Sequence, residues 1–350
     1  MHAGQLGLEI VNARGTDTRM KQIEHGSGGG VDSMRIVEAA RPTPGPGEIL
    51  IEVHFAGVNG PDLAQRQGRY PPPPGASPVL GLEVAGRIAE IGAGVTEWKV
   101  GDWVTALVPG GGYAEYCVTS ERHALPIPQG LTLAQAAGLP ETWFTVWANL
   151  IDRAGLKAGE RVLIHGGSSG IGLAAIGLAR LIAARPFVTV GSAQKAQFCR
   201  DFGAEAAIDY RQEDFVARIK QVTDQEGVDV VLDMVGGPYL QKNVSVLRRD
   251  GRLVMIAFLQ GSKVEFDFMP MMIKRLTITG STRRPRTVDE KARIRDALLR
   301  EVWPAFAGGR LRTHVFGVYP LEKAAEAHRI MEGSQHIGKL ILQVRDTTGI

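Results

Sequence analysis

A glycine-rich segment between residues 166 and 172 has the residue types and the spacing to bind a phosphate group. Its four glycines are Gly166, Gly167, Gly170 and Gly172. Glycines spaced in this way let the backbone turn tightly and approach a pyrophosphate, which the free amides and positive end of a following helix would bind. We therefore predict a dinucleotide site, with a tight strand-to-helix turn as the alternative. The residues predicted to contact the cofactor are Gly167, Ser168, Gly170, Ile171 and Gly172.

The end of the next predicted strand indicates which dinucleotide binds. An NAD site usually places Asp or Glu about 20 residues beyond the glycines, where the carboxylate binds the ribose 2′-hydroxyl. Gly191 and Ser192 stand there instead, and Lys195 follows. A missing carboxylate and a nearby cation favour the 2′-phosphate of NADPH, to which Tyr210 could also donate. The alternative for Lys195 is an ordinary solvated lysine.

The uncharged segment that contains these glycines resembles a membrane span only superficially. Residues 162–179 carry no formal charge, but five of these 18 residues are glycine. A lipid span requires about 20 apolar residues, and glycines near its start would break the helix. The segment is therefore better interpreted as a strand, a loop and a helix, and we expect no contact with a membrane.

The residues that follow alternate between strand and helix patterns. Six short apolar runs are predicted strands, at residues 161–165, 187–190, 206–208, 228–232, 252–257 and 276–279. The predicted helices lie at residues 171–184, 193–202, 213–222 and 239–247. Pro186 is expected to end the first helix. This alternation predicts an α/β domain of Rossmann type, with a six-stranded, parallel, doubly wound sheet.

The flanking segments predict a second, mostly β domain. Residues 35–125 combine short strand patterns with turn signals rich in Pro and Gly, and residues 311–344 show strand, helix and strand in turn. We therefore place a nucleotide-binding domain at 143–283, inserted between two parts of a catalytic domain at 20–142 and 284–350. Residues 1–19 lack a pattern and are interpreted as an N-terminal tail or extension.

Charge and cysteine content exclude several classes of protein. Forty Lys and Arg against 37 Asp and Glu give a net charge of +3, too balanced for a nucleic-acid binder, although weak binding stays open. Cys117 and Cys199 alone cannot form a disulfide framework or a cysteine-rich zinc lobe, and we expect both thiols to be buried. No secretory signal is visible. The expected location is therefore the cytoplasm.

Three other segments carry a family resemblance. Residues 81–92 (GLEVAGRIAEIG), 99–104 (KVGDWV) and 337–339 (IGK) resemble hallmarks of the medium-chain dehydrogenase/reductase superfamily. The resemblance implies a GroES-like catalytic domain. In the zinc alcohol dehydrogenases of this superfamily, a histidine ligand stands where this chain has Leu82 and a cysteine ligand where it has Asn59. The cysteine cluster of their structural zinc is absent, so the resemblance implies no metal.

The segment 57–77 resembles a narrower group, the zinc-free quinone oxidoreductases of the zeta-crystallin-like branch that includes the tumour-suppressor-inducible quinone reductases. The resemblance implies that Asn59 and Tyr70 line the catalytic site, Asn59 through its amide and Tyr70 as a donor of a hydrogen bond or proton. Asn59 could instead be a turn residue, and Tyr70 could cap the proline run. Gly60 and Gly177 depart from the residues common in the group.

The same resemblance implies further cofactor contacts and an assembly. The implied contacts are Asn59, whose amide could hold the nicotinamide or the substrate oxygen, and Thr145, Val235, Gly236, Phe258, Leu259 and Lys339. Members of the group often form homodimers through the edge of the nucleotide sheet, so a homodimer is expected. Glu83 could act as a general base, but structural support is favoured. The basic run 283–286 is interpreted as a solvated loop, with a phosphate or RNA contact as the alternative.

These inferences combine into one principal functional hypothesis. The chain is expected to reduce a small quinone with NADPH by hydride transfer without a metal, because the nicotinamide carries the hydride and the protein supplies orientation and donors for the anion that forms. The first alternative is an enone, alkenal or enoyl-thioester reductase with the same cofactor. The second is an NADPH-binding crystallin-like or RNA-binding protein with little turnover.

Overall fold

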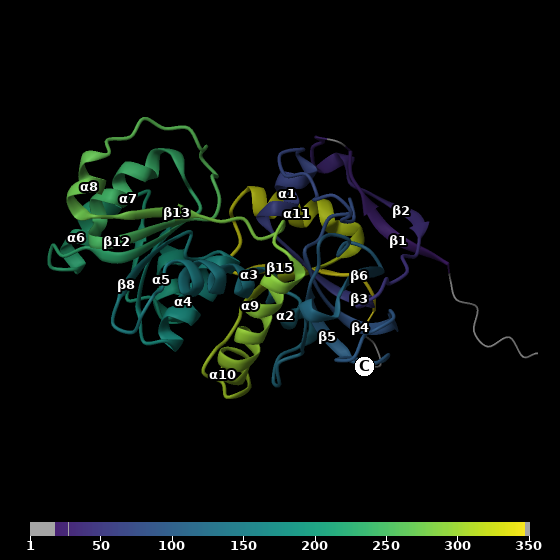
Figure 1. Cartoon of the computed structure of the whole chain (residues 1–350). Helices are drawn as coiled ribbons and strands as arrows, with labels where there is room; N and C mark the ends of the chain where they lie inside the picture. Colours follow the sequence, from purple (N-terminus) through teal and green to yellow (C-terminus); the bar gives the residue numbers. More distant parts are fainter. Residues whose placement is uncertain (1–17, 27, 347–350) are drawn as a thin grey trace, which may run out of the picture.

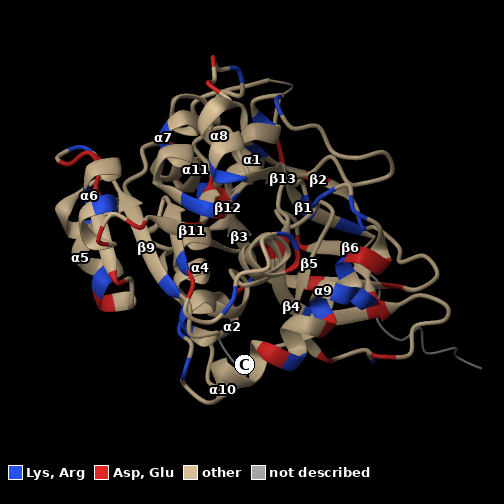
Figure 2. Ribbon diagram, turned by 60° about the vertical axis from the view of Figure 1, so that its left-hand side comes forward, with Lys and Arg blue, Asp and Glu red and all other residues tan. Residues whose placement is uncertain are grey.

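The computed structural model describes residues 18–26 and 28–346, which form two lobes side by side (Figure 1). The predicted tail at 1–19 lies outside the described residues except for its last two positions. Figure 2 shows basic and acidic residues interspersed over both lobes. Within the described ranges, no helix combines the length and apolar character needed to cross a membrane.

One lobe is built on a six-stranded sheet in the order β10-β9-β8-β11-β12-β13, and every neighbouring pair is parallel. Its strands are β8 Arg161–His165, β9 Arg185–Val190, β10 Ala206–Asp209, β11 Val228–Asp233, β12 Leu247–Met255 and β13 Thr277–Gly280. The predicted doubly wound sheet is therefore confirmed. The strand order reverses between β8 and β11, which is where such sheets bind ligands, at the carboxyl ends of their strands.

The helices of this lobe cover both faces of the sheet. They are α4 Gly170–Leu181, α5 Ala193–Phe202, α6 Phe215–Val222, α7 Leu240–Val246 and α8 Met269–Lys274. Helix α5 has the predicted bounds and ends at Gly203, whose φ of 121° suits glycine. Two boundaries were predicted wrongly. Helix α4 stops before Ala183, which adopts a φ of 60°, and Pro186 lies inside β9 and does not end the helix. Strand β12 already begins at Leu247, directly after α7.

The other lobe contains a seven-stranded sheet in the order β14-β15-β3-β4-β5-β7, in which β6 also pairs with β3. Its strands are β3 Glu48–Val58, β4 Glu83–Ile91, β5 Trp103–Leu107, β6 Tyr116–Ser120, β7 Ala124–Pro126, β14 Val315–Pro320 and β15 Lys339–Gln343. Strands β1 (Arg19–Glu24) and β2 (Arg35–Ala40) form a separate hairpin. Strand β15 pairs antiparallel with β3, so the C-terminal part of the chain returns to the seven-stranded sheet, the second sheet of the molecule.

Short helices accompany the second sheet and the junction between the lobes. They are α1 Gly60–Arg66, α2 Leu133–Ala136, α3 Pro140–Val146, the π-helix η3 Trp147–Arg153, α9 Val288–Glu301, α10 Trp303–Ala307 and α11 Ala324–Glu332. Residues of α3, α9 and α10 share one hydrophobic cluster with α4. The labels of α3, α9 and β15 lie between the lobes in Figure 1. We call the lobe with the six-stranded sheet the nucleotide lobe, because the sequence places the dinucleotide site there. The candidate site is expected where these connecting segments meet the carboxyl ends of its strands.

Candidate active site

The loop after β8 has a backbone that only glycine accommodates at several positions. Gly166 has a φ of 71°. A Cβ at Gly167 would overlap the Val188 side chain, and a Cβ at Gly172 would overlap the carbonyl oxygens of Gly166 and Gly167. Ser169 caps α4 by accepting a 3.0 Å hydrogen bond from the Gly172 amide. The first-turn amides before it have no carbonyl partner within the helix, so the loop fits a pyrophosphate group.

A buried polar network lies beneath this loop and was not found from the sequence. His165 contacts Thr189 Oγ1 at 2.8 Å and Asn243 Oδ1 at 2.7 Å, and Asn243 Nδ2 donates to Asp233 at 3.0 Å. Asp233 in turn accepts the amide of Val235 at 2.7 Å. Burial lowers the pKa of His165, so its ring is neutral at neutral pH. The network fixes the loop after β11 relative to β8 and β9.

The loops after β11 and β12 meet in the structure. A Cβ at Gly236 would lie 2.6 Å from the Phe258 ring, and the Leu259 amide donates to the Met234 carbonyl at 3.1 Å. Phe258 and Leu259 are exposed, at 47% and 72% of their surface. Both loops therefore line the edge of the sheet where the strand order reverses. Cofactor contacts of these residues stay predictions.

The carboxyl ends of β9 and β10 bring together the residues predicted to select the nucleotide. Ser192 caps α5 by accepting the Lys195 amide at 3.3 Å, and the Lys195 ammonium donates to the Ser334 carbonyl. A Cβ at Gly191 would lie 2.8 Å from the Tyr210 hydroxyl and 3.5 Å from Arg211 Nε. Burial and the positive charge of Arg211 lower the pKa of Lys195. Two cations, Lys195 and Arg211, thus face this corner of the lobe, at the carboxyl ends of β9 and β10.

The sequence analysis did not identify Arg211 as a phosphate contact. Its position directly after Tyr210, just beyond the predicted strand, was a signal that could have indicated a second cation there. Arg211 is exposed, and its backbone amide donates to Asp209 at 3.1 Å. Among the described residues, no carboxylate forms an ion pair with the Lys195 ammonium. The corner therefore has the charge that a phosphate would neutralise.

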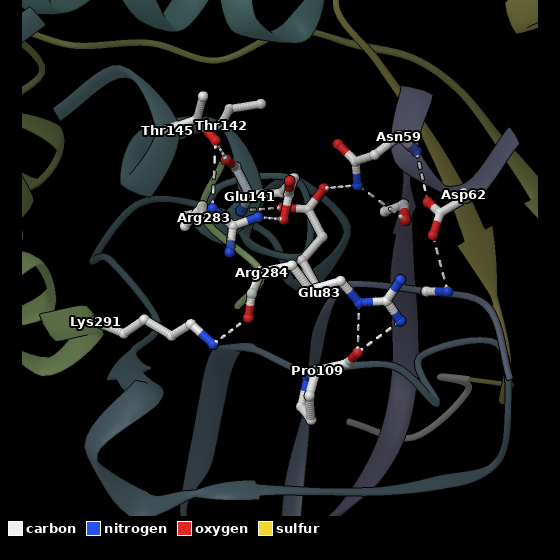
Figure 3. A network of polar contacts seen from close by, with 12 residues as sticks. Asn59, Asp62, Glu83, Pro109, Glu141, Thr142, Thr145, Arg283, Arg284 and Lys291 are labelled. Carbon is white, nitrogen blue, oxygen red and sulfur yellow. Dashed lines mark hydrogen bonds and ion pairs between the residues drawn. The ribbon is translucent and has the colours of Figure 1, made fainter. Parts of the chain in front are cut away.

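Asn59 belongs to the lobe with the seven-stranded sheet, where it directly precedes α1, and it is 6% exposed. Asn59 Nδ2 donates to Glu83 Oε1 at 2.9 Å, and Asn59 Oδ1 accepts from Lys339 Nζ at 2.7 Å. Asp62 holds the Asn59 backbone at the start of α1 by accepting its amide at 2.8 Å. Figure 3 shows the side chains of Asn59, Asp62 and Glu83 in this arrangement. The completely buried Glu83 supports Asn59, as the sequence favoured.

The remaining predicted residues lie beside a buried ion pair at the junction of the lobes (Figure 3). Arg283 pairs with Glu141, and the Glu141 amide donates to Glu83 Oε2 at 2.8 Å. Thr145 Oγ1 donates to the Glu141 carbonyl at 2.7 Å and accepts from Arg283 Nε at 3.4 Å. This chain of contacts connects Thr145, on α3, with Glu83 and, through Glu83, with Asn59.

Tyr70 packs against the segment that follows β13. The Arg284 guanidinium lies 5.5 Å from the centre of the Tyr70 ring. Burial raises the pKa of the partly buried Tyr70, so its hydroxyl is protonated and able to donate at neutral pH. The structure therefore leaves Tyr70 competent for the donor role predicted from the sequence, and that role stays a prediction.

The interpretation of residues 283–286 as a solvated loop was wrong. The side chain of Arg283 is 9% exposed in its ion pair with Glu141. Arg284 is 5% exposed, and it donates to the Pro109 carbonyl at 2.8 Å and to Gln65 Oε1 at 2.7 Å. Both arginines fasten the segment that leaves the nucleotide lobe onto the other lobe. Partners far away in the sequence caused the error, because no local pattern announces them.

The residues around Asn59 do not suit a zinc ion. Leu82 offers no ligand atom, and Glu83 already binds the ammonium of Lys339 at 2.6 Å. Across residues 18–26 and 28–346, no three His, Cys, Asp or Glu side chains gather as potential metal ligands. Cys117 and Cys199 are both buried, as expected.

Comparisons with known families agree with the two lobes. Residues 45–129 match the family described as the alcohol dehydrogenase GroES-like domain, and residues 170–298 match the one described as zinc-binding dehydrogenase. The quinone oxidoreductase of Homo sapiens is 33% identical over 309 residues, which cover 87% of this chain and 92% of that protein. A mycocerosic acid synthase-like polyketide synthase of Mycolicibacterium smegmatis is 35% identical over 320 residues, 91% of this chain. This chain spans only 15% of that synthase.

Solved structures show the same two kinds of relative. The Escherichia coli quinone oxidoreductase complexed with NADPH matches with a TM-score of 0.81 and 30% identity, over 93% of this chain and 99% of that one. The JamJ enoyl reductase matches with a TM-score of 0.83 and 26% identity, also over 93% and 99%. Quinone oxidoreductases and enoyl reductases are thus similar to this chain to a comparable degree.

Proposed function

Because this chain belongs to the medium-chain dehydrogenase/reductase superfamily of oxidoreductases, we propose that it reduces quinones with NADPH, by hydride transfer without a metal. The observation that carries the proposal is the closeness of two half-sites: the glycine loop, where the cofactor would bind, and Asn59, beside which the acceptor would bind. The Gly338 amide donates to the Ser168 carbonyl of the glycine loop at 2.8 Å, and the next residue, Lys339, binds Asn59. A cofactor on the loop and an acceptor beside Asn59 would therefore be neighbours, and such proximity favours transfer between them.

Bound NADPH supplies the hydride. The amides at the start of α4 would hold its pyrophosphate, and Lys195, Tyr210 and Arg211 would bind the 2′-phosphate. Tyr70 donates a hydrogen bond to the phenolate oxygen that develops on the quinone, because its hydroxyl is protonated at neutral pH. The buried Arg283–Glu141 pair keeps the two lobes in register, so that the donor and the acceptor sides stay aligned.

Reduction of an enone, alkenal or enoyl thioester is the second candidate. The similarity to the JamJ enoyl reductase and to the polyketide synthase of Mycolicibacterium smegmatis favours it. In this reaction the hydride goes to the β carbon and Tyr70 stabilises an enolate instead of a phenolate. The half-sites are the same, so only the acceptor distinguishes the two candidates.

A panel of acceptors tests the proposal. NADPH oxidation is followed at equal concentrations of a benzoquinone, an alkenal and an enoyl-CoA. The proposal expects the highest kcat/KM for the quinone. A kcat/KM that is highest for enoyl-CoA would replace it with the second candidate, whereas NADPH binding without oxidation by any acceptor would contradict both.

We also propose that the chain forms a homodimer through the nucleotide lobe. Strand β13 is the edge strand of its sheet, and neighbouring helix α8 exposes Met269, Met272 and Ile273 at 54%, 64% and 60%. An apolar surface of this kind beside an open sheet edge is typical of an interface. The mass in solution by light scattering should be that of two chains, and Met272→Lys should reduce it to one. A single-chain mass for the unmodified protein would contradict the proposal.

A further inference from the structure

Lys339 makes a set of contacts that its predicted role in cofactor binding does not explain. Its ammonium donates to Asn59 Oδ1 at 2.7 Å and to the Val58 carbonyl at 2.9 Å, and it forms an ion pair with Glu83 Oε1 at 2.6 Å. Three oxygen atoms thus surround the ammonium, two as hydrogen-bond acceptors and one as the partner in an ion pair. The side chain of Lys339 is 5% exposed and that of Glu83 is completely buried. The Lys339 ammonium is therefore held in one position and shielded from solvent.

This arrangement leaves the Asn59 amide only one orientation. An ammonium group can only donate hydrogen bonds and a carboxylate can only accept them. The Asn59 oxygen must therefore face Lys339 and its nitrogen must face Glu83, as the distances of 2.7 and 2.9 Å show. A flipped amide would place N–H hydrogens against the ammonium and an oxygen against the carboxylate. Both of these contacts are repulsive.

The backbone beside Lys339 reaches the cofactor loop. Gly338 has a φ of 76°, and its amide donates to the Ser168 carbonyl at 2.8 Å. The Lys339 stem packs on the loop as well, because a Cβ at Gly170 would lie 2.6 Å from Lys339 Cδ. One residue thus links the glycine loop to the amide on the acceptor side. A lysine at this position can hold the two half-sites in register.

We propose that Lys339 is a positioning residue for hydride transfer, which acts by locking the Asn59 amide in one orientation against Glu83. The inference rests on the proposed function, because it assigns Asn59 to the acceptor pocket. It goes further in naming the residue that fixes the direction of the amide dipole there. Lys339 itself acts through Asn59 and need not touch the acceptor.

The test uses a variant that keeps the pocket neutral. Lys339→Met alone would leave the buried Glu83 charge unpaired and could unfold the chain, so Lys339→Met is combined with Glu83→Gln. Methionine retains most of the stem that packs on the glycine loop. The matched control is Lys274→Met. The ammonium of Lys274 also has three oxygen partners, the carbonyls of Val244, Ser245 and Leu247, but Lys274 lies on α8, away from Asn59.

The kinetic readout is a double-mutant cycle with Asn59→Ala, on proteins shown to be folded by circular dichroism. We expect Lys339→Met/Glu83→Gln to lower kcat at least about tenfold, because small misplacements are costly in hydride transfer, while the NADPH dissociation constant changes less than about twofold. Added to Asn59→Ala, the same pair should lower kcat no further. Full additivity in the cycle, or an unchanged kcat in the pair, would overturn the inference. Lys274→Met should retain the wild-type kcat.

A second readout is independent of activity. The side-chain NH₂ group of Asn59, followed by ¹⁵N NMR with assignment through Asn59→Ala, should exchange slowly with water in the unmodified chain. It should exchange at least about tenfold faster in Lys339→Met/Glu83→Gln, because its locked orientation is lost. Equal exchange rates would overturn the inference even if no acceptor were reduced. A chain that locks the amide but reduces no acceptor would contradict only the proposed function.

Discussion

Replacing Lys195 by methionine should remove most of the preference for NADPH over NADH. Lys195 lies at the start of α5, close to Tyr210 and Arg211, and its ammonium donates to the Ser334 carbonyl. The Lys195→Met variant loses the contact with the Ser334 carbonyl whichever cofactor is bound. The cost of that loss therefore cancels from the ratio of kcat/KM for NADPH to kcat/KM for NADH. Only NADPH carries the 2′-phosphate, so the lost charge pair affects NADPH alone.

The expected size follows from the environment of the ammonium. A hydrogen bond to a charged group contributes about 1.5–3 kcal/mol. Lys195 is neither fully buried nor fully exposed, and Arg211 remains beside the phosphate in the variant. Solvent screening therefore places the loss near the lower end, which corresponds to a fall of about 10- to 30-fold in the NADPH/NADH ratio of kcat/KM.

The assay measures kcat/KM for NADPH and for NADH with one quinone, and checks both dissociation constants by cofactor fluorescence. Lys220→Met is the matched control, since Lys220 is an exposed lysine on α6 of the same lobe. Its ratio should equal that of the unmodified chain. An unchanged ratio in Lys195→Met would refute the assignment of the 2′-phosphate to this corner.

Three further predictions concern the site and its support. Tyr70→Phe should lower quinone turnover several-fold with little change in NADPH affinity, and wild-type turnover would exclude a donor role. Gly172→Ala should destabilise the chain by about 1–3 kcal/mol through overlap with backbone oxygens and weaken NADPH binding, whereas Gly177→Ala, in the same helix, should stay within about 1 kcal/mol of wild type. Burial raises the pKa of Asp62 to about 7. The protonated form is therefore favoured by folding, and the stability that Asp62 contributes is lost as pH rises from about 4 through 7, by up to about 4 kcal/mol. In urea titrations across this range, the stability gap between wild type and Asp62→Asn should shrink as pH rises, and a growing gap would contradict this sign.

Local patterns were sufficient to predict most of the nucleotide lobe. The glycine loop, the six parallel strands and the bounds of α5 depend on apolar periodicity and capping residues that are close in sequence. The errors lie where tertiary pairing overrides such signals. Pro186 would end a helix locally, yet it pairs with Val162 inside the sheet, because α4 stops earlier and the chain turns through Ala183.

The candidate site was predicted only as a set of separate residues. The sequence named Asn59 and Lys339, but the hydrogen bond between them joins positions 280 residues apart. The contact between Arg283 and Glu141 spans 142 residues. Lys339, Glu83 and Arg283 become a connected network only through the antiparallel return of β15 onto β3 and through the two crossings between the lobes. Spacing along one sequence carries no record of such pairings.

The central claim is that this chain carries a hydride from NADPH to a quinone held beside Asn59. Rapid mixing of the NADPH-loaded protein with a benzoquinone, with cofactor oxidation and hydroquinone formation recorded together, tests it most directly. The account predicts one hydroquinone for each NADPH oxidised, and a slower reaction when the transferred hydrogen of NADPH is replaced by deuterium. NADPH that binds but is never oxidised, or oxidation with no deuterium effect on the transfer step, would contradict it.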